Sequence, residues 1–265
     1  MLNPKISIVT ITYNSERTLE ETILSVVTQD YPNLEYIIID GGSKDRTLEI
    51  VDKYRDKISF VISEPDKGIS DAFNKGIRYA TGEIIGIINS DDILLGWTLN
   101  TLAKNYNPNV DVYSMNVVLW DDINNHKVRE IPTVTNLNCY NMSVHVAHQG
   151  RFITKKAYEK WGCFDGRLKY MMDWDLLVRF YKSNAVFQYI NHDAALYRLG
   201  ATTSDNIKKK KNDVRILVEN NKGNRLSFIY IWSIFKLRNY MKNILDFLFG
   251  ENFKRMIRYR EYDNK

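Results

Sequence analysis

The stretch that decides the fold is Glu83–Asp92, which reads EIIGIINSDD. A run of isoleucines ends in a polar turn with two adjacent carboxylates, Asp91 and Asp92, and short apolar runs of this kind are typical of buried parallel strands. The carboxylates are therefore predicted at a strand's C-terminal end, where open α/β sheets bind ligands. Adjacent acids repel unless a cation lies between them, and their oxygen atoms suit Mg²⁺ or Mn²⁺. This stretch alone leaves a second interpretation open, in which the aspartates cap the next helix.

The preceding residues repeat the same order of strand, polar turn and helix. Strands are predicted at 5–12, 34–39 and 58–62, and helices at 16–28, 45–54 and 69–80. This alternation indicates βαβ units and a mostly parallel central sheet flanked by helices. The four strands end in Tyr13-Asn14, Asp40-Gly41-Gly42, Asp66-Lys67-Gly68 and Asp91-Asp92. Because these turns share one sheet edge, we expect them to line one nucleotide-binding crevice.

Several functional classes are excluded by what the sequence lacks. Neither GxGxxG after the first strand nor GxxxxGK[ST] occurs, so dinucleotide and P-loop chemistry are not supported. The 265 residues are 44% hydrophobic and 26% charged, a globular composition that allows one large core. Cys139 and Cys163 form neither a metal spacing nor a disulfide framework, and no signal peptide or membrane span is visible. We therefore expect a cytoplasmic protein, and no nucleic-acid partner because basic charge gathers in one tail.

Two blocks of sequence closely resemble the family 2 glycosyltransferases of the GT-A fold. They read ISIVTITYNSERTLEETILSVVTQDYPNLEYIIIDGGSKDRT and SEPDKGISDAFNKGIRYATGEIIGIINSDD, and the resemblance resumes at HQGRFITKKAYEKWGCFDGRLKYMMDWDLLVRF. Within the family, the chain most resembles the bacterial members that build exopolysaccharide, capsule or O-antigen repeat units. The resemblance implies a GT-A domain over 1–204, with a nucleotide-sugar donor half at 1–95 and an acceptor and catalytic half at 96–204.

The implied reaction is an inverting, metal-dependent glycosyl transfer. A sugar would pass from a nucleoside diphosphate sugar to a hydroxyl of a saccharide acceptor, expected to be lipid-linked, in surface polysaccharide biosynthesis. By resemblance, Thr12, Tyr13 and Asn14 would hold the base and ribose, Asp40 would accept a hydrogen bond from the base, Asp66 would contact the nucleoside, and Asp91 would face the ribose or sugar. Asp92 would bind the Mn²⁺ or Mg²⁺ that bridges the diphosphate, because Asn89 stands where relatives often carry an acid.

The second half is predicted to hold a helix at 97–106, strands at 111–120, 127–131 and 151–154, and a helix that begins at Asp173. By resemblance Asp173 is the catalytic base, which accepts the proton of the attacking sugar hydroxyl. From spacing alone a first-turn carboxylate favoured by the helix dipole is the better explanation, and only the resemblance favours catalysis. Asp175 is expected to pair with Arg179 at i, i+4, and His148 to contact donor or acceptor. Relatives often carry a late histidine near Tyr197-Arg198, which is absent or replaced here.

The tail, residues 205–265, lies outside the resemblance and is predicted to be a basic, aromatic, helical extension. Over residues 206–265, 15 Lys and Arg oppose 6 Asp and Glu, a net charge of +9. Apolar residues flanked by cations suit a helix that lies on an anionic membrane surface. The same pattern suits packing on the protein's own core or on a second copy in a homo-oligomer. All three interpretations stay open at this point.

Two other functions fit parts of the pattern. A sugar-1-phosphate nucleotidyltransferase shares the sheet and the metal site, but it would carry a glycine-rich loop and a basic residue where this chain has Thr12-Tyr13-Asn14. A non-catalytic sugar-nucleotide-binding module would tolerate the loss of Asp92 and Asp173, and both are present. The glycosyltransferase is therefore the leading hypothesis.

Overall fold

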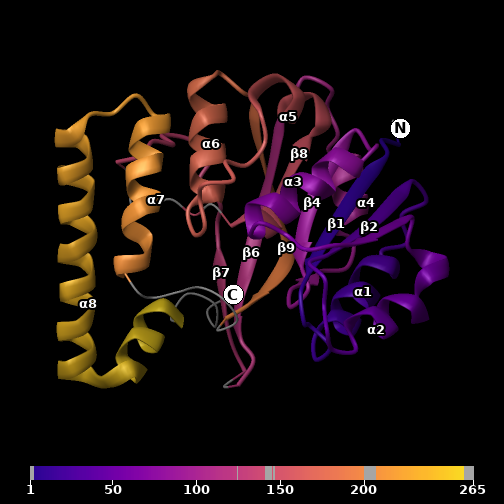
Figure 1. The fold of residues 1–265 in the computed structure, drawn as a ribbon, viewed down its shortest axis with the longest axis horizontal. Helices are drawn as coiled ribbons and strands as arrows, with labels where there is room; N and C mark the ends of the chain where they lie inside the picture. Colours follow the sequence, from indigo (N-terminus) through magenta and orange to yellow (C-terminus); the bar gives the residue numbers. More distant parts are fainter. Residues whose placement is uncertain (1–2, 124, 141–144, 146, 200–206, 260–265) are drawn as a thin grey trace.

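The computed structural model describes residues 3–123, 125–140, 145, 147–199 and 207–259, which form a central sheet with helices on both faces (Figure 1). The strands are β1 (Ile6–Thr12), β2 (Leu34–Asp40), β3 (Phe60–Ser63), β4 (Ile84–Asn89), β5 (Ile93–Leu94), β6 (Val112–Asp121), β7 (His126–Glu130), β8 (Arg151–Thr154) and β9 (Phe187–Arg198). The helices are α1 (Leu19–Val27), α2 (Thr47–Lys53), α3 (Ile69–Tyr79), α4 (Thr98–Lys104), α5 (Lys155–Trp161), α6 (Met172–Lys182), α7 (Ile207–Asn220) and α8 (Arg225–Tyr259), with 3₁₀ turns η1 (Arg55–Lys57) and η2 (His148–Gly150).

The first four strands form a parallel sheet in the order β3-β2-β1-β4. Their register aligns the C-terminal ends: Thr12 pairs with Asp40, and Asp40 pairs with Ser63. On the other side of β1, Ile11 pairs with Asn89. Each strand and helix predicted for residues 5–92 is present, and the polar turns lie along one sheet edge as expected.

The second half continues the sheet in the order β8-β6-β9-β5, with β7 paired to β6. The sheet becomes mixed here, because β8 runs antiparallel to both β4 and β6 while β6 and β9 are parallel. The twelve-residue β9 and the two-residue β5 were not predicted. β5 is too short for a periodic signal and is held by antiparallel pairing with β9, which lies far away in the sequence.

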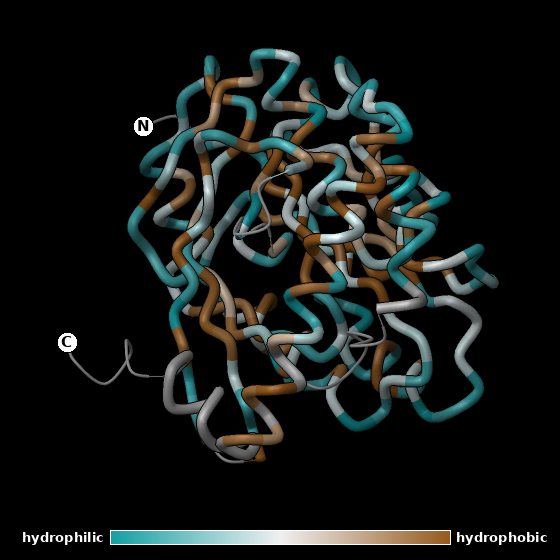
Figure 2. The backbone as a smooth tube through the Cα atoms, turned by 90° about the vertical axis from the view of Figure 1, so that its left-hand side faces the viewer, coloured by the Kyte–Doolittle hydropathy of each residue, from teal (hydrophilic) through white to brown (hydrophobic). Residues whose placement is uncertain are grey.

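Two apolar layers cover the two faces of the sheet. One layer contains α1, α2 and α4, with Leu19, Ile23 and Leu99 fully buried. The other contains α3, α5 and α6, and it extends to α7 and α8. Figure 2 shows the hydrophobic strands inside and hydrophilic turns at the periphery. Burial of both faces explains why the strands of the parallel half are continuous apolar runs rather than alternating ones.

The C-terminal extension is joined to this core through α7. The side chains of Val214 and Leu217 are fully buried, and α7 lies between α6 and α8 (Figure 1). The predicted boundary at 204/205 falls within 200–206, outside the described residues, and it stays a prediction. The described part of the extension nevertheless packs as a further layer of the same core.

Asp213 of α7 holds the segment that leads into α6. Its Oδ2 accepts the backbone N–H groups of Lys169 (2.9 Å), Tyr170 (2.6 Å) and Met171 (3.1 Å), and Asp213 is almost fully buried. A carboxylate that accepts three N–H groups fixes a chain segment firmly, because hydrogen bonds to charged groups are the stronger ones. Asp173 is the second residue of α6, so its position depends on this contact.

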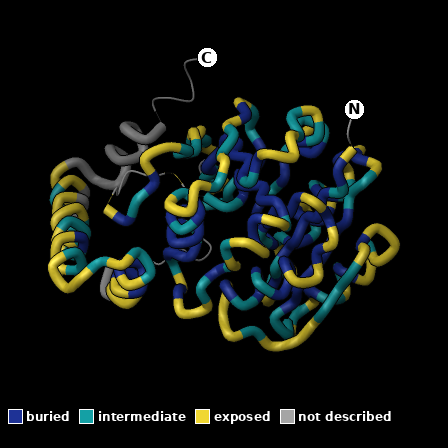
Figure 3. The backbone as a smooth tube through the Cα atoms, turned by 90° about the horizontal axis from the view of Figure 1, so that it is seen from above, coloured by how far each residue is buried: buried dark blue, intermediate teal, exposed yellow. Residues whose placement is uncertain are grey.

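The long helix α8 has two different sides. Phe228, Trp232 and Phe235 pack against the core, and Ile231 is fully buried. The predicted packing on the protein's own core is therefore correct for this side. The other side is exposed along most of the straight part of the helix (Figure 3). Among the described residues, no helix is both long and apolar enough to cross a membrane.

Replacing Asp213 by Ala should lower the free energy of unfolding by about 2–4 kcal/mol, because three backbone N–H groups lose their buried, charged acceptor. Denaturant unfolding of the two proteins measures the difference. As a matched control on the same helix, Glu219→Ala removes solvent-exposed ion pairs with Arg215 and Arg167 and should cost less than about 1 kcal/mol. Equal losses in the two variants would contradict the anchoring role of Asp213.

Candidate functional site

The turn after β2 is shaped by a buried carboxylate. Asp40 is fully buried, and its oxygens accept the N–H groups of Gly42 (3.1 Å) and Ser43 (3.0 Å) and the hydroxyls of Ser43 and Ser63 (each 2.5 Å). The Asp40 oxygens already accept the hydrogen bonds that order the turn. Direct binding of a nucleotide base by Asp40 therefore stays a prediction. Thr12, which pairs with Asp40, is also buried, and its hydroxyl has no hydrogen-bond partner among the described residues.

The turns after β1, β2 and β3 converge around Gly41. A Cβ at Gly41 would lie 2.9 Å from Asp66 Oδ2 and 3.3 Å from Tyr13 Cδ2, so only glycine fits without displacing one of them. The side chain of Tyr13 is 62% exposed, which leaves its ring accessible to a ligand. Asn14 adopts a left-handed backbone conformation (φ 49°), and its Oδ1 accepts the N–H of Lys44. Tyr13, Asn14 and Asp66 are thus brought together as predicted.

A buried lysine holds the turn after β3. Lys75 Nζ lies 2.6 Å from Asp66 Oδ1 and 3.0 Å from Glu64 Oε1, and it donates to the carbonyl of Pro65. Burial lowers the pKa of Lys75, but Asp66 and Glu64 outweigh this effect and raise it. The ammonium group therefore stays charged and fixes Asp66.

The two adjacent aspartates after β4 differ in their surroundings. Asp92 is fully buried, and its carboxylate accepts the side-chain amide of Gln149 (2.7 Å) and the backbone N–H of Arg198 (3.1 Å). Asp91 is only partly buried, and its carboxylate accepts no hydrogen bond from another described residue. Asp91 therefore offers oxygen atoms to a ligand, whereas those of Asp92 are already bound.

The surroundings of both aspartates disfavour their ionised forms. Burial, and then the neighbouring Asp91, raise the pKa of Asp92 to about 7. Burial also raises the pKa of Asp91, although Arg198 and His148 oppose this shift. A cation at this position would relieve the cost of two close negative charges.

Asp91 could supply one carboxylate to a divalent cation. No cluster of three or more His, Cys, Asp or Glu suited to a metal is found among the described residues. Mg²⁺ commonly takes only one or two carboxylates from the protein and its other ligands from water and substrate phosphates. The prediction that Asp92 holds the metal stays a prediction, and the free oxygens of Asp91 favour Asp91 for that task.

Arg198 occupies the place where relatives were expected to have a late histidine. Its Nε donates to the carbonyl oxygen of Asp91 (3.1 Å), and its other nitrogens pair with Asp122 and Glu21. The guanidinium also lies over the ring of Trp120, 4.5 Å from the centroid. The end of β9 therefore brings a fixed cation to the two aspartates, which sequence spacing could not reveal because β9 was not predicted.

His148 connects Asp173 to the strand that carries the aspartates. Its Nδ1 is 2.9 Å from Asp173 Oδ2, and its Nε2 is 3.2 Å from Asn89 Oδ1. Gly150 allows the η2 turn to approach β6, because a Cβ there would lie 2.5 Å from the carbonyl oxygen of Met115. Helix α6 and strand β4, which come from the two halves of the chain, thus meet at one imidazole.

Both partners of the His148 ring are oxygen acceptors, so the ring donates from both nitrogens when it is protonated. Burial by itself lowers the pKa of His148, but Asp173, Asp92 and Asp91 outweigh burial and raise it. The imidazolium form is therefore favoured between these three carboxylates.

Arg151 is a functional candidate that sequence reasoning missed. It is buried, and it donates to the hydroxyl of Ser114 (2.5 Å) and to the carbonyls of Thr133 (3.0 Å) and His145 (2.7 Å). Burial lowers the pKa of Arg151 to about 9 while Asp173 opposes the shift, so the guanidinium is charged at neutral pH. Arg151 is the first residue of β8, and nothing in the neighbouring sequence indicates that its side chain is buried.

A cavity of about 10 Å³, room for roughly one water molecule, separates Arg151 from Asp173. Its lining includes both residues and His148. Asp173 Oδ1 and Arg151 Nε are buried and have no hydrogen-bond partner among the described residues. The cavity is too small for a sugar, so it is not a substrate site. Its walls are mostly apolar, and His148, Arg151 and Asp173 contribute polar side chains to its lining.

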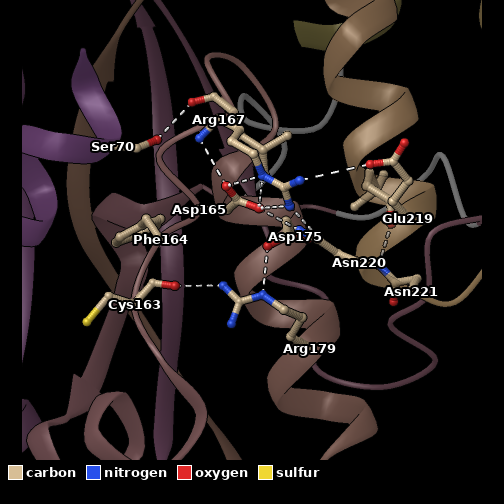
Figure 4. Close-up of polar contacts among 12 residues, drawn as sticks. Ser70, Cys163, Phe164, Asp165, Arg167, Asp175, Arg179, Glu219, Asn220 and Asn221 are labelled. Atoms are coloured by element: carbon tan, nitrogen blue, oxygen red, sulfur yellow. Dashed lines mark hydrogen bonds and ion pairs between the residues drawn. The ribbon is translucent and has the colours of Figure 1, made fainter. Parts of the chain in front are cut away.

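The pairing predicted for Asp175 is confirmed. Asp175 is fully buried, and its Oδ2 lies 2.7 Å from Arg179 Nε. Its Oδ1 accepts the amide of Asn220, which also donates to Asp165 (Figure 4). Arg167 beside Asp165 lowers the pKa of that carboxyl despite partial burial. Figure 4 shows this network connecting the loop before α6, α6 itself and α7, which supports a structural role for Asp175.

A family model described as Glycosyl transferase family 2 matches residues 7–164. The chain belongs to this family. An uncharacterised family relative from Rickettsia typhi is 28% identical over 206 residues, which cover 73% of this chain and 63% of the relative. The chain thus spans less than two thirds of the length of that glycosyltransferase. TarS of Staphylococcus aureus, named as a poly(ribitol-phosphate) β-N-acetylglucosaminyltransferase, is 35% identical over 104 residues, 37% of this chain and 18% of TarS.

Two solved structures share the fold of this family 2 chain. TarS residues 1–349 with UDP-GlcNAc superimpose with a TM-score of 0.63 at 18% identity, covering 94% of this chain and 77% of that one. The mannosyltransferase PcManGT of Pyrobaculum calidifontis, with GDP-Man and Mn²⁺, superimposes with a TM-score of 0.59 at 17% identity. This match covers 83% of this chain and 63% of PcManGT. At these identities the likeness is one of fold, and it confirms the predicted α/β GT-A arrangement.

Replacing Arg151 by Met should lower the free energy of unfolding by about 2–4 kcal/mol, because the buried hydroxyl of Ser114 and two partly buried carbonyls lose a charged donor. Denaturant unfolding at neutral pH measures the loss. The control Arg46→Met removes an exposed arginine paired only with nearby Glu49, so it should change stability by less than about 0.5 kcal/mol. A loss of similar size in both variants would contradict the structural role inferred for Arg151.

Proposed function

We propose that this protein transfers a sugar from a nucleoside diphosphate sugar to a hydroxyl group of a saccharide acceptor. The observation that carries the proposal is the pairing of Asp173 with His148, whose other nitrogen meets Asn89 at the end of β4. A carboxylate suited to accept a proton is thereby held beside the turn with Asp91 and Asp92. Membership of family 2 supports the same reaction class.

The donor is proposed to bind along the aligned ends of β1, β2, β3 and β4. Tyr13 offers an exposed ring for the base, and the ordered turn of Asp40 offers backbone groups beside it. Asp66 and Asn14 are held in place by Lys75 and by the Lys44 backbone. The base and the sugar of the donor are left open, since UDP-GlcNAc and GDP-Man belong to the two solved relatives.

A Mn²⁺ or Mg²⁺ ion would supply Lewis-acid stabilisation of the leaving diphosphate. Asp91 would be its ligand from the protein, with Asp92 behind it as a buried charge that strengthens cation binding. Arg198 would add a second, fixed positive group on the β9 side. The Mn²⁺ in the PcManGT structure supports the choice of metal class.

Asp173 would act as the base in a single displacement that inverts the anomeric carbon. The acceptor oxygen attacks that carbon, the bond to the diphosphate breaks, and the hydroxyl proton passes to the Asp173 carboxylate. His148 would keep this carboxylate ionised and oriented by donating from Nδ1. Arg151 would support the same charge from the far side of the small cavity.

The acceptor is proposed to be lipid-linked, which would place the reaction at the inner, cytoplasmic face of the cell membrane in surface polysaccharide biosynthesis. The transfer to poly(ribitol phosphate) in the name of TarS is one surface-polymer precedent among the relatives. A nucleotidyltransferase is less well supported, because the turn after β1 carries Thr12-Tyr13-Asn14 without a glycine-rich loop. A binding module without catalysis would not need the Asp173–His148 pair.

Replacing Asp173 by Asn should reduce transfer by at least about 10³-fold while donor affinity changes less than about threefold, because an amide cannot accept the proton. Turnover is measured with the donor that raises thermal stability most, and donor affinity by calorimetry. Wild-type turnover by Asp173→Asn would remove the assignment of the base.

Replacing Asp91 by Asn should abolish the rise in melting temperature that Mn²⁺ and donor produce together, a stabilisation of about 2.7 kcal/mol at 100 times the dissociation constant. Asp92→Asn should unfold at lower temperature, because Gln149 and the Arg198 N–H lose a charged acceptor, but it should keep part of the Mn²⁺ response. The opposite pattern, with the response lost only in Asp92→Asn, would return the ligand role to Asp92.

Replacing His148 by Gln should lower kcat on the order of 10–100-fold with little change in donor affinity. The acid limb of the pH–rate profile should move to higher pH, because the charged ring no longer favours the ionised base. His192→Gln on β9 is the control, since the described contact of the His192 ring is with the hydroxyl of Thr98 and not with a carboxylate of the site. An unchanged profile in His148→Gln would leave His148 with a packing role only.

A further inference from the structure

The exposed side of α8 carries a row of exposed apolar side chains. We call it the α8 outer face, and it consists of Leu226, Ile229, Tyr230, Leu237, Tyr240, Met241, Phe247 and Leu248. These positions are separated mainly by three, four or seven residues, so they lie on one side of a helix. Leu237 is 61% exposed and Phe247 is 89% exposed, although both are large apolar side chains.

The opposite side of α8 already has its own partner. Phe228, Ile231, Trp232 and Phe235 pack on the core that includes α7. Packing on the core therefore accounts for the inner side. On the outer face the ring of Tyr230 lies near that of Tyr140 (centroids 6.3 Å apart), while Leu226, Leu237 and Phe247 are largely exposed. Figure 3 shows the straight part of α8 at the edge of the molecule, with exposed residues along it.

The charges of this helix have a single sign over its first six turns. Residues 225–245 contain Arg225, Lys236, Arg238 and Lys242 and no Asp or Glu. At about 100° per residue, Lys236 lies beside one edge of the α8 outer face and Arg238 lies beyond the opposite edge. An apolar stripe with cations on both flanks matches a helix that lies in the plane of an anionic lipid surface.

A second copy of the chain is a poorer occupant for the same face. Helices that pair through such a stripe normally carry flanking charges of opposite sign. Two copies of this face would bring Arg225 and Lys236 together, and residues 225–245 contain no acid to pair with them; the first acid of the helix is Asp246. Like charges placed close together oppose association, whereas anionic headgroups attract all of these cations.

We propose that the α8 outer face docks on the surface of a bilayer that contains anionic lipids. The aromatic and aliphatic side chains enter the interface, and the flanking lysine and arginine side chains contact the headgroups. The docking does not depend on which reaction the protein catalyses. It adds to the lipid-linked acceptor proposed above by naming the surface of this chain that meets the membrane.

The test is sedimentation of the full chain with vesicles, in the absence of donor and acceptor. Vesicles of phosphatidylcholine alone are compared with vesicles that contain about one third phosphatidylglycerol. The protein should bind the anionic vesicles at least tenfold more tightly, and salt should weaken this binding because the attraction falls off within a Debye length.

Two variants separate the apolar and the charged contributions. Leu226→Gln with Leu237→Gln should weaken binding on the order of tenfold or more, because two apolar side chains no longer enter the interface. Lys236→Gln with Arg238→Gln should weaken binding to anionic vesicles by about 30-fold, since each cation contributes roughly a fivefold factor. Neither pair should alter the melting temperature strongly, because these side chains are exposed.

Matched controls carry the same kinds of change far from α8. Ile123→Gln removes an exposed apolar side chain of the β6–β7 turn, and Lys44→Gln with Lys57→Gln removes two exposed cations of the donor half. These controls should bind anionic vesicles as the wild type does. Binding that is equally weakened in the controls would show only a response to total charge and would overturn the proposal.

Three other results would also overturn it. The first is no binding of the wild type to anionic vesicles. The second is binding that the α8 variants leave unchanged. The third is a dimer, seen by analytical ultracentrifugation without lipid, that Leu226→Gln with Leu237→Gln dissociates, since the α8 outer face would then be an interface between copies. Because no donor is present, a failed vesicle test leaves the transferase proposal standing, and a failed transfer assay leaves the docking proposal standing.

Discussion

The site depends on balancing buried negative charge. Asp92 lies where burial penalises ionisation, and Asp91 and Asp173 add two further carboxylates around His148. His148 contacts Asp173 directly, and Arg198 binds the backbone of the aspartate pair. Each cation comes from a different part of the second half, so the carboxylates can coexist only when that half has folded against the parallel strands. The charge balance therefore joins the two halves more specifically than apolar packing alone would.

The same principle extends into the C-terminal residues. Asp213 of α7 accepts three backbone N–H groups just before α6, and Asn220 links Asp165 to Asp175. The segment that positions Asp173 is thus braced from behind by α7. α8 then covers α7 with its inner side and presents its outer face away from the core. One C-terminal segment consequently supports the site and offers a surface to the surroundings.

Most of the donor half could be predicted because its signals are local. Isoleucine-rich strands buried on both faces, amphipathic helices and polar turns recur at short spacing, and register then aligns Thr12, Asp40 and Asn89 at one edge. The second half was harder. β5 and β9 depend on pairing between residues about a hundred positions apart, and a two-residue strand has no periodicity to detect. The aspartate pair was found, but its unequal burial was not, because burial depends on Gln149 and Arg198 from distant segments.

The sequence by itself determined the order of strands and helices, the family resemblance and the set of acids at the strand ends, because these follow from periodicity and from short contiguous motifs. Tertiary structure alone decided which oxygen atoms are available: those of Asp91 are open, those of Asp40 and Asp92 are occupied, and His148 stands between Asp173 and Asn89. It also decided that α8 has a packed and an exposed side. The physical reason is that hydrogen bonding and burial are properties of neighbours in space, and the neighbours that matter here come from remote parts of the chain.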